Sequence, residues 1–521
     1  MRVLFVASEL FPLAKTGGLG DACAALPASL ERLGADVRAM LPGYVSALDA
    51  ACDKRTVARL ADGACLLLAR TPDTGLPVYL LDWPELFRRP GGPYQDSGKQ
   101  DWPDNLRRFA SFCAVAAQVA RSGDGSGWQP DLVHAHDWHT GLLPALLALH
   151  PGPRPASLFT IHNLAFQGNF PLDAARAQGL PEALLTPDGA EFYGQFSCLK
   201  AGIRYADRLT TVSPTYAREI LTPAFGAGLD GLLRTRAGDL VGILNGIDTL
   251  LWNPAADASL PVRFDVDHLA GKQADKAALR EELGLDPDAD GPLVVGVNRL
   301  THQKMADVIL QALPALLDQG AQVALHGQGD PELEAALLAA AAGRAARCAV
   351  RIGYEEPLAH RLNGAADIAL TPSRFEPCGL TTMYAMRYGA LPVTRAVGGL
   401  ADSVTDIATA HPDRACGTGF AFSDPTPEAL ADCLRRAGTL FRDPVAWRRC
   451  QRAAMQRDFG WEMSARRYLA LYGDLVTPET QTRPRPGPIS GDNGGRPPAL
   501  RPAVRWSGAG RAAPDWAEAA D

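Results

Sequence analysis

Residues 1–41 read MRVLFVASELFPLAKTGGLGDACAALPASLERLGADVRAML. Short apolar runs in this stretch alternate with a glycine loop and with apolar residues at helical spacing. We expect a strand, a loop, a helix and a second strand, in that order, at Val3–Ala7, Gly17–Gly20, Ala22–Leu33 and Val37–Leu41. This alternation is typical of βαβ units, whose parallel sheet is covered by helices on both faces. The opening therefore predicts an α/β fold.

The alternation continues along the chain and restarts once. In the first half, further strands are expected at Leu132–Ala135, Leu158–Ile161, Arg208–Val212 and Val241–Leu244. A second series follows an irregular stretch, Trp252–Asp267, and a helix-like segment, Lys272–Leu283. Its expected elements are Leu293–Val297, Asp307–Leu317, Val323–His326, Pro331–Ala342, Ala349–Ile352, Ala366–Thr371, Gly379–Tyr388 and Leu391–Thr394. Right-handed crossovers would make each half a doubly wound, Rossmann-like sheet. Two such sheets predict a ligand in a central cleft faced by the carboxyl ends of their strands.

Composition sets the domain boundaries and marks a different C-terminal segment. We expect one Rossmann-like domain at residues 1–243 and another at residues 244–458. The last 45 residues hold eight Pro, six Gly and six Arg and almost no periodic apolar residues. Such a segment cannot bury enough apolar surface to offset its conformational entropy. Residues 477–521 are therefore predicted to be a disordered tail, whose arginines either keep it solvated, the favoured interpretation, or contact an anionic partner.

Charge and apolar content exclude several classes of protein. Of 521 residues, 47% are apolar and 21% are charged, so wholesale disorder is excluded. The 51 basic and 58 acidic side chains are mixed along the chain and form no basic stripe, so a nucleic acid partner is not expected. No apolar run approaches about 18 residues, which excludes a membrane partner, and the first apolar run is too short for a signal peptide. Ten cysteines without a Cys-x-x-Cys pair predict reduced thiols, no structural metal and a cytoplasmic location.

Two loops with basic side chains follow the expected first strands of the two halves. Lys15–Asp21 leads from a strand into a helix, so its glycines would let the backbone approach a ligand while the helix N-terminus offers free amides to an anion. It matches neither the dinucleotide fingerprint nor the P-loop. Arg299–Lys304 occupies the equivalent place in the second half, where two cations would grip a diphosphate. The alternatives are a tight turn with an exposed lysine and an exposed basic turn.

A third loop, Ser373–Thr382, lies between an expected strand and a helix. Gly379 removes a side chain there, and the amides of Leu380 and Thr381 would open the helix toward a phosphate. Glu376 either lies at the mouth of the site or is a solvated charge or helix cap. Cys378 is a poor candidate for a nucleophile because no histidine is fixed beside it in the sequence.

Histidines gather after two further strands, in His134–His139 and Thr160–Asn163. A metal site is the obvious alternative, but the spacing is not H-E-x-x-H, and alternate strand residues do not form a tetrahedral centre. We therefore interpret these side chains, His162 and Asn163 among them, as polar groups that line a sugar or nucleotide pocket.

Taken together, these motifs resemble the family of bacterial glycogen synthases and plant starch synthases. The resemblance covers about residues 1 to 475 and lies in seven segments in the family's order, with a following Gly-Gly motif: Lys15–Asp21, His134–Leu142, Thr160–Gly168, Gly194–Gly202, Asn245–Asp248, Arg299–Lys304 and Ser373–Leu380, then Gly398–Asp402. It implies a GT-B fold in which the last helix, expected at Trp461–Leu475 within residues 459–476, crosses back to the first domain. It also implies a retaining glycosyltransferase that moves glucose from ADP-glucose to the non-reducing end of glycogen or another α-1,4-glucan.

The resemblance also implies roles for single residues. Lys15 and Gly18 would contact the donor phosphate and glucose, Arg299 and Lys304 the diphosphate, and Tyr354 the adenine. The glucose pocket would include Glu376, Cys378, Gly379, His162 and Asn245. The backbone amides of Leu380 and Thr381 would bind the diphosphate. Asp137 and Tyr94 would lie near the sugar and acceptor. The expected catalytic set is Lys15, Asp137, His162, Arg299, Lys304 and Glu376.

The implied chemistry agrees with these residue types. Departure of ADP builds negative charge on the diphosphate, and two cations with a helix N-terminus would stabilise that charge without a metal ion or other cofactor. Retention requires either a carboxylate nucleophile or front-side attack with the leaving phosphate as base. The family is usually described by the second route, in which the backbone carbonyl at His162 supports the sugar cation and Glu376 holds sugar hydroxyls.

The sequence departs from the family pattern at two positions. Met305 stands where a glycine usually follows Lys304, and the long side chain either displaces the diphosphate or leans away from it. His326 stands where a small apolar residue is common, a change that we expect to be tolerated. Two alternatives stay open: a GT-B enzyme with another donor such as UDP-glucose, and a catalytically impaired glucan-binding homologue. The sequence leaves the oligomeric state open.

Overall fold

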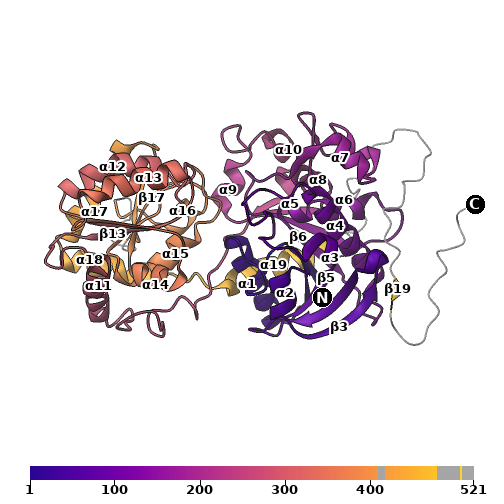
Figure 1. The fold of residues 1–521 in the computed structure, drawn as a ribbon, viewed down its shortest axis with the longest axis horizontal. Coiled ribbons are helices and arrows are strands. Elements are labelled where there is room, and N and C mark those ends of the chain that lie inside the picture. The colour runs from indigo at the N-terminus through magenta and orange to yellow at the C-terminus, as the bar shows by residue number, and fades with distance from the viewer. Residues whose placement is uncertain (409–416, 478–504, 507–521) are drawn as a thin grey trace, which may run out of the picture. The chain divides into compact units, whose positions relative to one another are not determined.

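Residues 1–408, 417–477 and 505–506 are described by the computed structural model, in which the chain divides into two units. Unit 1 comprises Met1–Thr210, Gly226–Val241 and Ala465–Asp521, and unit 2 comprises Thr211–Phe225 and Gly242–Ser464. Each unit is an α/β body, as the sequence predicts (Figure 1). Of the predicted tail, only Thr477, Arg505 and Trp506 lie within the described residues.

The main sheet of unit 1 has the strand order β12-β11-β7-β6-β1-β2-β5-β4-β3-β19. Its strands are β1 (Arg2–Val6), β2 (Asp36–Pro42), β3 (Cys52–Arg59), β4 (Cys65–Arg70), β5 (Pro77–Asp82), β6 (Leu132–His136), β7 (Ala156–Ile161), β11 (Arg208–Thr211), β12 (Leu240–Gly242) and β19 (Arg505–Trp506). A smaller sheet joins β8 (Asn169–Pro171), β10 (Gln195–Ser197) and β9 (Glu191–Phe192). Strand β1 pairs in parallel with β2 on one side and β6 on the other, so the strand order reverses beside it.

One edge of this sheet differs from the parallel sheet that the sequence predicts. Strand β4 pairs antiparallel with both β3 and β5, and β19 pairs antiparallel with β3. These strands form the edge of unit 1 near the β3 and β19 labels (Figure 1). The expectation is wrong here because short turns, and no crossover helix, join β3, β4 and β5, and a short connection between paired strands forces them antiparallel.

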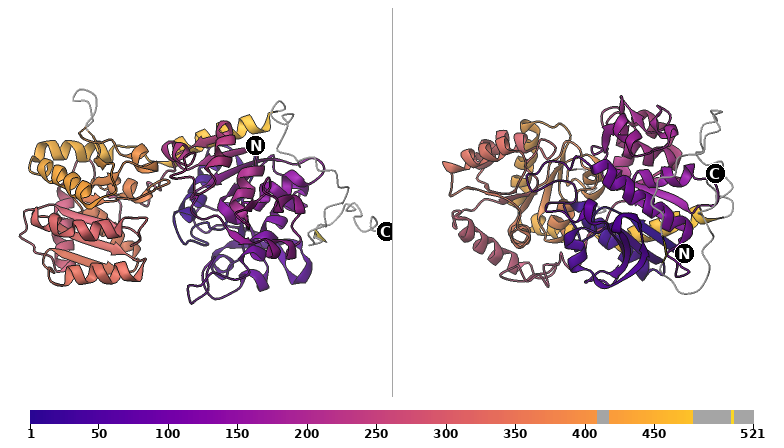
Figure 2. Two further views of the ribbon diagram at one scale, coloured as in Figure 1. Left: turned by 90° about the horizontal axis from the view of Figure 1, so that it is seen from above. Right: turned by 45° about the vertical axis from the view of Figure 1, so that its right-hand side comes forward.

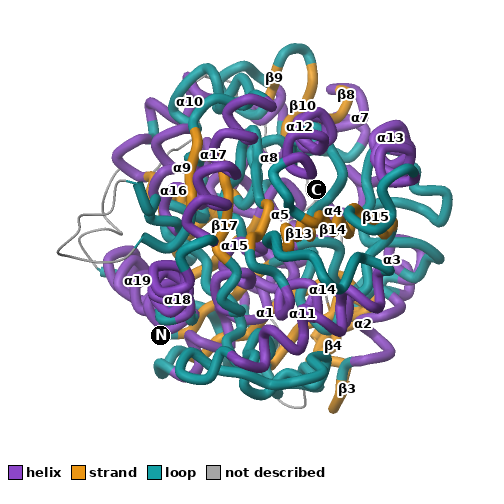
Figure 3. Tube along the Cα trace, turned by 90° about the vertical axis from the view of Figure 1, so that its left-hand side faces the viewer, coloured by secondary structure: helices purple, strands orange, loops and turns teal. Residues whose placement is uncertain are grey.

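The sheet of unit 2 is parallel throughout, in the order β15-β14-β13-β16-β17-β18. Its strands are β13 (Leu293–Val297), β14 (Gln322–Gly327), β15 (Cys348–Ile352), β16 (Ile368–Leu370), β17 (Leu391–Arg395) and β18 (Phe420–Phe422). Numbered along the chain, this order is 3-2-1-4-5-6, the doubly wound Rossmann order. Figure 3 shows β13, β14 and β15 side by side among the helices. The predicted fold class is confirmed.

Helices fill the connections in both units. Those of unit 1 are α1 (Gly18–Arg32), α2 (Val45–Ala50), α3 (Pro84–Phe87), α4 (Asn105–Ser122), α5 (Asp137–Thr140), α6 (Leu142–Leu149), α7 (Leu172–Ala177), α8 (Cys198–Tyr205) and α10 (Asp230–Thr235). Those of unit 2 are α9 (Pro214–Glu219), α11 (Ala270–Leu283), α12 (Ala306–Asp318), α13 (Pro331–Ala342), α14 (Glu356–Ala365), α15 (Leu380–Arg387), α16 (Gly398–Ser403), α17 (Pro427–Phe441) and α18 (Pro444–Met455). Helix α19 (Trp461–Val476) enters unit 1 at Ala465 and is the long yellow helix in Figure 2.

Most predicted elements are confirmed, and the errors lie at element ends. Strand Leu293–Val297 and helix Pro331–Ala342 have the predicted bounds. The expected loop Gly17–Gly20 is wrong from Gly18 onward, because α1 begins there with Gly17 as its N-cap. Gly379 likewise precedes its helix and is the N-cap of α15, with a φ of 85°. Glycine permits both helix starts but does not mark which residue begins the helix.

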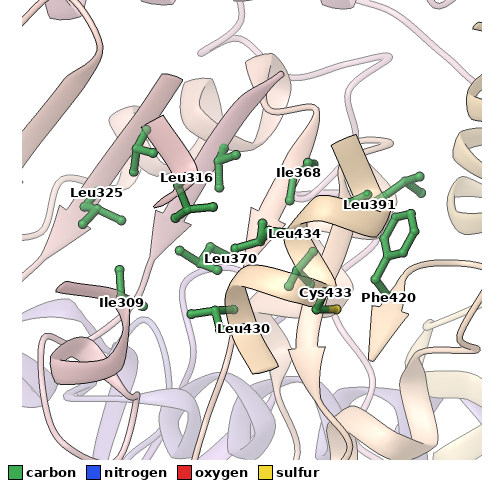
Figure 4. Packing of buried hydrophobic residues seen from close by; sticks show 14 of the residues in the cluster. Ile309, Leu316, Leu325, Ile368, Leu370, Leu391, Phe420, Leu430, Cys433 and Leu434 are labelled. Carbon is green, nitrogen blue, oxygen red and sulfur yellow. The ribbon is translucent and has the colours of Figure 1, made fainter. Parts of the chain in front are cut away.

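Two apolar clusters cover the two faces of the unit 2 sheet. Val294 packs with α12 and α13, whereas its neighbours Leu293 and Val295 pack with α11 and α14. Figure 4 shows the first cluster, in which Leu316 of α12 faces sheet residues such as Leu370. Because both faces of the sheet are buried, the adjacent central strands β13 and β16 carry no polar side chain, which explains their continuous apolar runs in the sequence.

The cysteines differ in one respect from the prediction of reduced thiols. Cys450 is disulfide-bonded, while eight other cysteines among the described residues are free. Spacing in the sequence carries no signal for such a bond, because pairing depends on the distance between side chains in the fold. Within the described ranges, the structure has no helix both long enough and apolar enough to span a lipid bilayer.

The buried face of α12 predicts a large stability difference between two leucines. Leu316 is 1% exposed in the core, so Leu316→Ala is expected to lower the free energy of unfolding by about 2–5 kcal/mol. Leu338 on the neighbouring helix α13 is 45% exposed, so Leu338→Ala is expected to change it by under about 1 kcal/mol. Urea unfolding followed by circular dichroism measures both, and equal effects would contradict this account of the core.

Candidate functional site

The predicted residues of unit 1 follow three neighbouring parallel strands. The loop with Lys15 follows β1, Asp137 follows β6, and His162 with Asn163 follows β7. The carboxyl ends of these strands lie at one edge of the sheet, and the strand order reverses between β1 and β6. Open α/β sheets bind ligands beside such a reversal.

Glu9 organises the loop after β1, and we did not predict it as a site residue. It is 2% exposed, and its Oε1 accepts hydrogen bonds from Thr16 Oγ1 at 2.5 Å and Tyr94 OH at 2.7 Å. Its Oε2 accepts from the backbone amides of Thr16 at 2.7 Å and Gly17 at 3.2 Å. A buried carboxylate bonded to successive amides fixes the loop that precedes α1. Only the fold brings these groups together, so no motif could have indicated Glu9.

Lys15 and Tyr94 lie on either side of this carboxylate network. The Lys15 Nζ lies 2.8 Å from Asp21 Oδ1, and both side chains are about one-third exposed. Gly18 is the first residue of α1, where backbone amides lack intrahelical acceptors. The Tyr94 ring stacks on His139 with centroids 4.3 Å apart, and burial raises the pKa of its hydroxyl. Lys15 can therefore exchange an exposed partner for an anion, whereas Tyr94 is held in place.

Asp137 links the ends of β6 and β7. Its Oδ1 accepts the backbone amide of His162 at 2.7 Å and that of Asn163 at 3.4 Å. Asp137 has a φ of 57°, in a region that costs a residue with a side chain about 1–2 kcal/mol. Burial raises its pKa to about 7, although the two amides oppose the shift. The strained backbone and the two bonds indicate that Asp137 positions the His162–Asn163 backbone.

Three buried histidines of unit 1 lie close together, and each forms hydrogen bonds. His136 Nδ1 lies 3.0 Å from His162 Nε2. His134 Nε2 lies 2.6 Å from Thr160 Oγ1, and its Nδ1 lies 2.7 Å from Tyr472 OH on α19. Burial lowers the pKa of all three histidines, that of His162 to about 3, so their rings are neutral near pH 7.

One group in the described part of the chain has the composition of a metal site. Ligand atoms of Cys23, His136 and His162 lie within 4.8 Å of one another. Burial, followed by the nearby carboxylates, raises the pKa of the Cys23 thiol, and the two imidazoles already hydrogen-bond to each other. A protonated thiol and a bonded imidazole pair favour a hydrogen-bonded cluster over metal ligands.

In unit 2 the predicted residues gather at the corresponding reversal of strand order. The loop with Arg299 and Lys304 follows β13, and the loop with Glu376 follows the adjacent β16. Lys304 Nζ pairs with Glu376 Oε2, which also accepts a hydrogen bond from Ser373 Oγ at 2.8 Å. Both members of the pair are nearly buried, whereas Arg299 is exposed and donates to Gln303 Oε1 at 2.9 Å.

A second ion pair holds these two loops together. Arg374 binds Asp307 with two parallel hydrogen bonds of 2.8 Å, and its backbone amide donates to Gln303 O at 2.8 Å. Such fork-shaped contacts fix orientation as well as distance. The pairing of Lys304 with Glu376 is therefore built on a loop-to-loop contact that we did not predict.

Two glycines allow the Glu376 loop to pack tightly against a later turn. A Cβ on Gly398 would lie 1.9 Å from Glu376 O, and one on Gly399 would lie 2.0 Å from Cys378 O. The Gly399 amide donates to Glu376 O at 2.9 Å. No larger residue fits at either glycine, which explains the Gly-Gly pattern in physical terms.

The other predicted residues of unit 2 surround the start of α15. Gly379 precedes Leu380 and Thr381, whose amides open the helix. The backbone of Asn245 hydrogen-bonds to Cys378, and burial raises the pKa of the Cys378 thiol to about 12. A thiol that stays protonated is a poor nucleophile, as the sequence indicated.

Tyr354 follows β15, at a strand end separate from the Glu376 loop. Its ring is 54% exposed and lies parallel to that of His326, with centroids 6.1 Å apart. His326 Nδ1 lies 3.2 Å from Arg351 O, and its Nε2 accepts the amide of Glu355 at 3.0 Å. His326 therefore ties down both sides of the loop that carries Tyr354.

Met305 leans away from the basic loop. It is the N-cap of α12, with a φ of 55°, and its side chain is fully buried in the unit 2 core. The side chain therefore does not cover Lys304 or Arg299.

Comparison with known proteins identifies both units. Residues 2–235 match the starch synthase catalytic domain, and residues 276–448 match the glycosyl transferases group 1. The glycogen synthase of Burkholderia thailandensis is 52% identical, with 99% of this chain and 97% of the relative covered. That of Paramagnetospirillum magneticum is 49% identical, with 91% and 98% covered. Among solved structures, the catalytic domain of starch synthase IV from Arabidopsis thaliana, bound to ADP and acarbose, is 33% identical with a TM-score of 0.82, over 91% of this chain and 99% of that one.

The buried histidines of unit 1 predict acid sensitivity. Each of these four histidines has a pKa in the folded chain below its unfolded value near 6.5. Protonation therefore favours the unfolded chain, and each histidine lowers the free energy of unfolding by up to about 1.4 kcal/mol for every unit by which the pH falls. The pKa of Asp137, which is raised to about 7, has the opposite effect. Its contribution to the free energy of unfolding is present at low pH and is lost as the pH rises through 7. The histidines outnumber it, so we expect the free energy of unfolding to fall from pH 6.5 to 4.5.

A matched pair of variants tests the source of this slope. His139 is 5% exposed, and its Nδ1 has no hydrogen-bond partner among the described residues, so His139→Phe should flatten the pH dependence. His268 is exposed and pairs with Asp265 at the surface, so His268→Phe should change the dependence much less. Urea unfolding at several pH values measures both, and an unaltered slope in His139→Phe would contradict the assignment.

Proposed function

The chain belongs to the family of glycogen and starch synthases and is a GT-B glycosyltransferase, and we propose that it transfers glucose from ADP-glucose to the non-reducing end of an α-1,4-glucan with retention of configuration. The observation that carries this proposal is the strand reversal of unit 2, where the loop with Arg299 and Lys304 follows β13 and the loop that leads into α15 follows β16. The relative from Arabidopsis was solved with ADP, which agrees with an adenine nucleotide as the leaving group.

In this proposal the diphosphate binds the cations and the amides of Leu380 and Thr381. Charge develops on the diphosphate as the bond to the sugar breaks, and fixed donors stabilise that charge more than they stabilise the intact donor. We assign Lys15, in the loop before α1, and Gly18, the first residue of that helix, to contacts with the donor phosphate and glucose. Tyr354 stacks on the adenine, because it is exposed and its loop is held rigid by His326.

The sugar is held by groups that cannot act as nucleophiles. Glu376 is already paired with Lys304 and bonded to Ser373, so its carboxylate orients sugar hydroxyls. Cys378 stays protonated and, like Gly379 and Asn245, is assigned to glucose binding. Asn163 is assigned to sugar binding as well. His162 is neutral, and its backbone carbonyl supports the positive sugar while Asp137 positions that backbone. Front-side attack assisted by the leaving phosphate is the route that fits these groups.

We further propose that Tyr94 lies near the acceptor glucan and that the enzyme works in the cytoplasm. Of the two alternatives, a different nucleotide-sugar donor is tested directly below. The case for an impaired homologue was Met305, and it is weakened because the Met305 side chain is buried in the core and leaves the cations open.

The proposal predicts incorporation of glucose from ADP-glucose into glycogen, with UDP-glucose a much poorer donor. Lys15→Ala and Glu376→Ala are expected to lower kcat/KM by about 100-fold or more, because each removes a charge from the reacting centre. Arg299→Ala should act mainly on the donor, while Arg448→Ala, an equally exposed arginine on α18, should have no effect. Full activity in both of the first two variants would defeat the site assignment.

The His326 contacts predict an effect confined to donor binding. His326→Ala frees the amide of Glu355 and loosens the loop that presents Tyr354, which should raise the KM for ADP-glucose about three- to tenfold with little change in kcat. His326→Gln retains an acceptor and should restore part of the loss. A kcat effect without a KM effect would argue against this role for the loop.

A further inference from the structure

A surface cavity of unit 1 lies on elements that carry none of the proposed catalytic residues. Its volume is about 380 Å³, and it is lined by the turn Glu191–Tyr193, by Lys200 and by the Gly228–Leu229 segment. The turn joins β9 to β10, and Lys200 lies in α8. The function proposed above leaves this cavity without an assignment.

Tyr193 presents an aromatic ring at the mouth of the cavity. Its side chain is 83% exposed, an unusual state for so large a ring, and its φ of 50° is a conformation that residues with a Cβ adopt at a cost. The ring meets that of Phe192 edge to face, with centroids 4.7 Å apart and an interplanar angle of 82°. The two-residue hairpin turn Tyr193–Gly194 requires positive φ angles at both residues, and it leaves the Tyr193 ring exposed to solvent.

The backbone at Gly228 packs against both aromatic rings. Gly228 has a φ of 81°, and a Cβ there would lie 3.0 Å from Phe192 Cζ and 3.3 Å from Tyr193 Cε2. The glycine thus allows the two rings to lie against the backbone of residues 227–229. Little conformational entropy remains to be lost when a ligand stacks on a ring held in this way.

The polar groups around the rings are also oriented. Lys200 Nζ donates to Pro187 O at 2.7 Å and to Glu191 O at 2.5 Å, and Glu191 Oε1 accepts the amide of Gly194 at 2.6 Å. A carboxylate has capacity for further hydrogen bonds, so Glu191 can still accept from hydroxyl groups. One acidic and one basic side chain balance each other, which suits an uncharged ligand better than a nucleotide or an acidic peptide.

We propose that this cavity binds a segment of α-1,4-glucan, separately from the residues that transfer glucose. A glucosyl ring has an apolar face that stacks on an aromatic side chain and a rim of hydroxyls that bond to fixed polar groups. The inference rests on the proposed function, since a polymeric acceptor can occupy a second site while its chain end reacts. Such a second attachment raises the local concentration of chain ends.

The test compares full-length variants for binding and for catalysis. Tyr193→Ala should weaken binding to glycogen about three- to tenfold, measured by cosedimentation, and should raise the KM for glycogen by a similar factor. Tyr193→Phe keeps the ring and should bind like the unmodified protein. Val445→Ala, at a residue 81% exposed on α18, is the control for removal of an exposed apolar side chain.

Short acceptors separate this site from the transfer site. With maltotriose as acceptor, kcat and KM should be unchanged in Tyr193→Ala, since so short a chain cannot occupy both places. Undiminished glycogen binding in Tyr193→Ala would overturn the proposal, and so would an equal loss with maltotriose, which would place Tyr193 in the transfer site. Failure of the proposed function would show differently, as a lack of glucose incorporation by the unmodified protein whatever its binding of glycogen.

Discussion

The reversal of strand order beside the first strand of each sheet is the constraint on which the proposed site depends. In unit 2 the reversal lies between β13 and β16, and the loops that follow these strands carry Lys304 and Glu376. In unit 1 it lies between β1 and β6, and the following residues are the Glu9–Gly17 loop and Asp137. Helices leave the sheet in opposite directions at such a point, so the strand ends are uncovered and can hold polar groups that a covered sheet would exclude.

Close backbone contacts then give these loops one conformation each. In unit 2 the contact of Gly398 and Gly399 with the Glu376 loop leaves no room for side chains, and in unit 1 Glu9 and Asp137 hold successive amides. The shared result is preorganisation, so that little rearrangement is needed when charge develops on a ligand.

The sequence predicted the elements with strong apolar periodicity and the motifs that follow them. Leu293–Val297 was predicted to the residue because its first four positions are buried and Val297 is partly buried against the core. Strand β3, next to the last strand of its sheet, was missed because most of its side chains are exposed and its apolar pattern is weak. Glu9 and the Arg374–Asp307 pair were missed for a different reason: each acts through partners distant in sequence, and an isolated charged residue gives no pattern.

Met305 shows how the fold accommodates a departure from the family pattern without losing the loop. A residue with a side chain at a φ of 55° costs about 1–2 kcal/mol relative to glycine. Full burial of a methionine side chain contributes about 1.5–3 kcal/mol, and this side chain is fully buried in the cluster that supports α12. The free energy gained by burying the Met305 side chain slightly exceeds the cost of its backbone conformation. The left-handed residue at the start of α12 is therefore retained. Lys304, one residue earlier, can therefore keep its direction toward Glu376 although the glycine is gone.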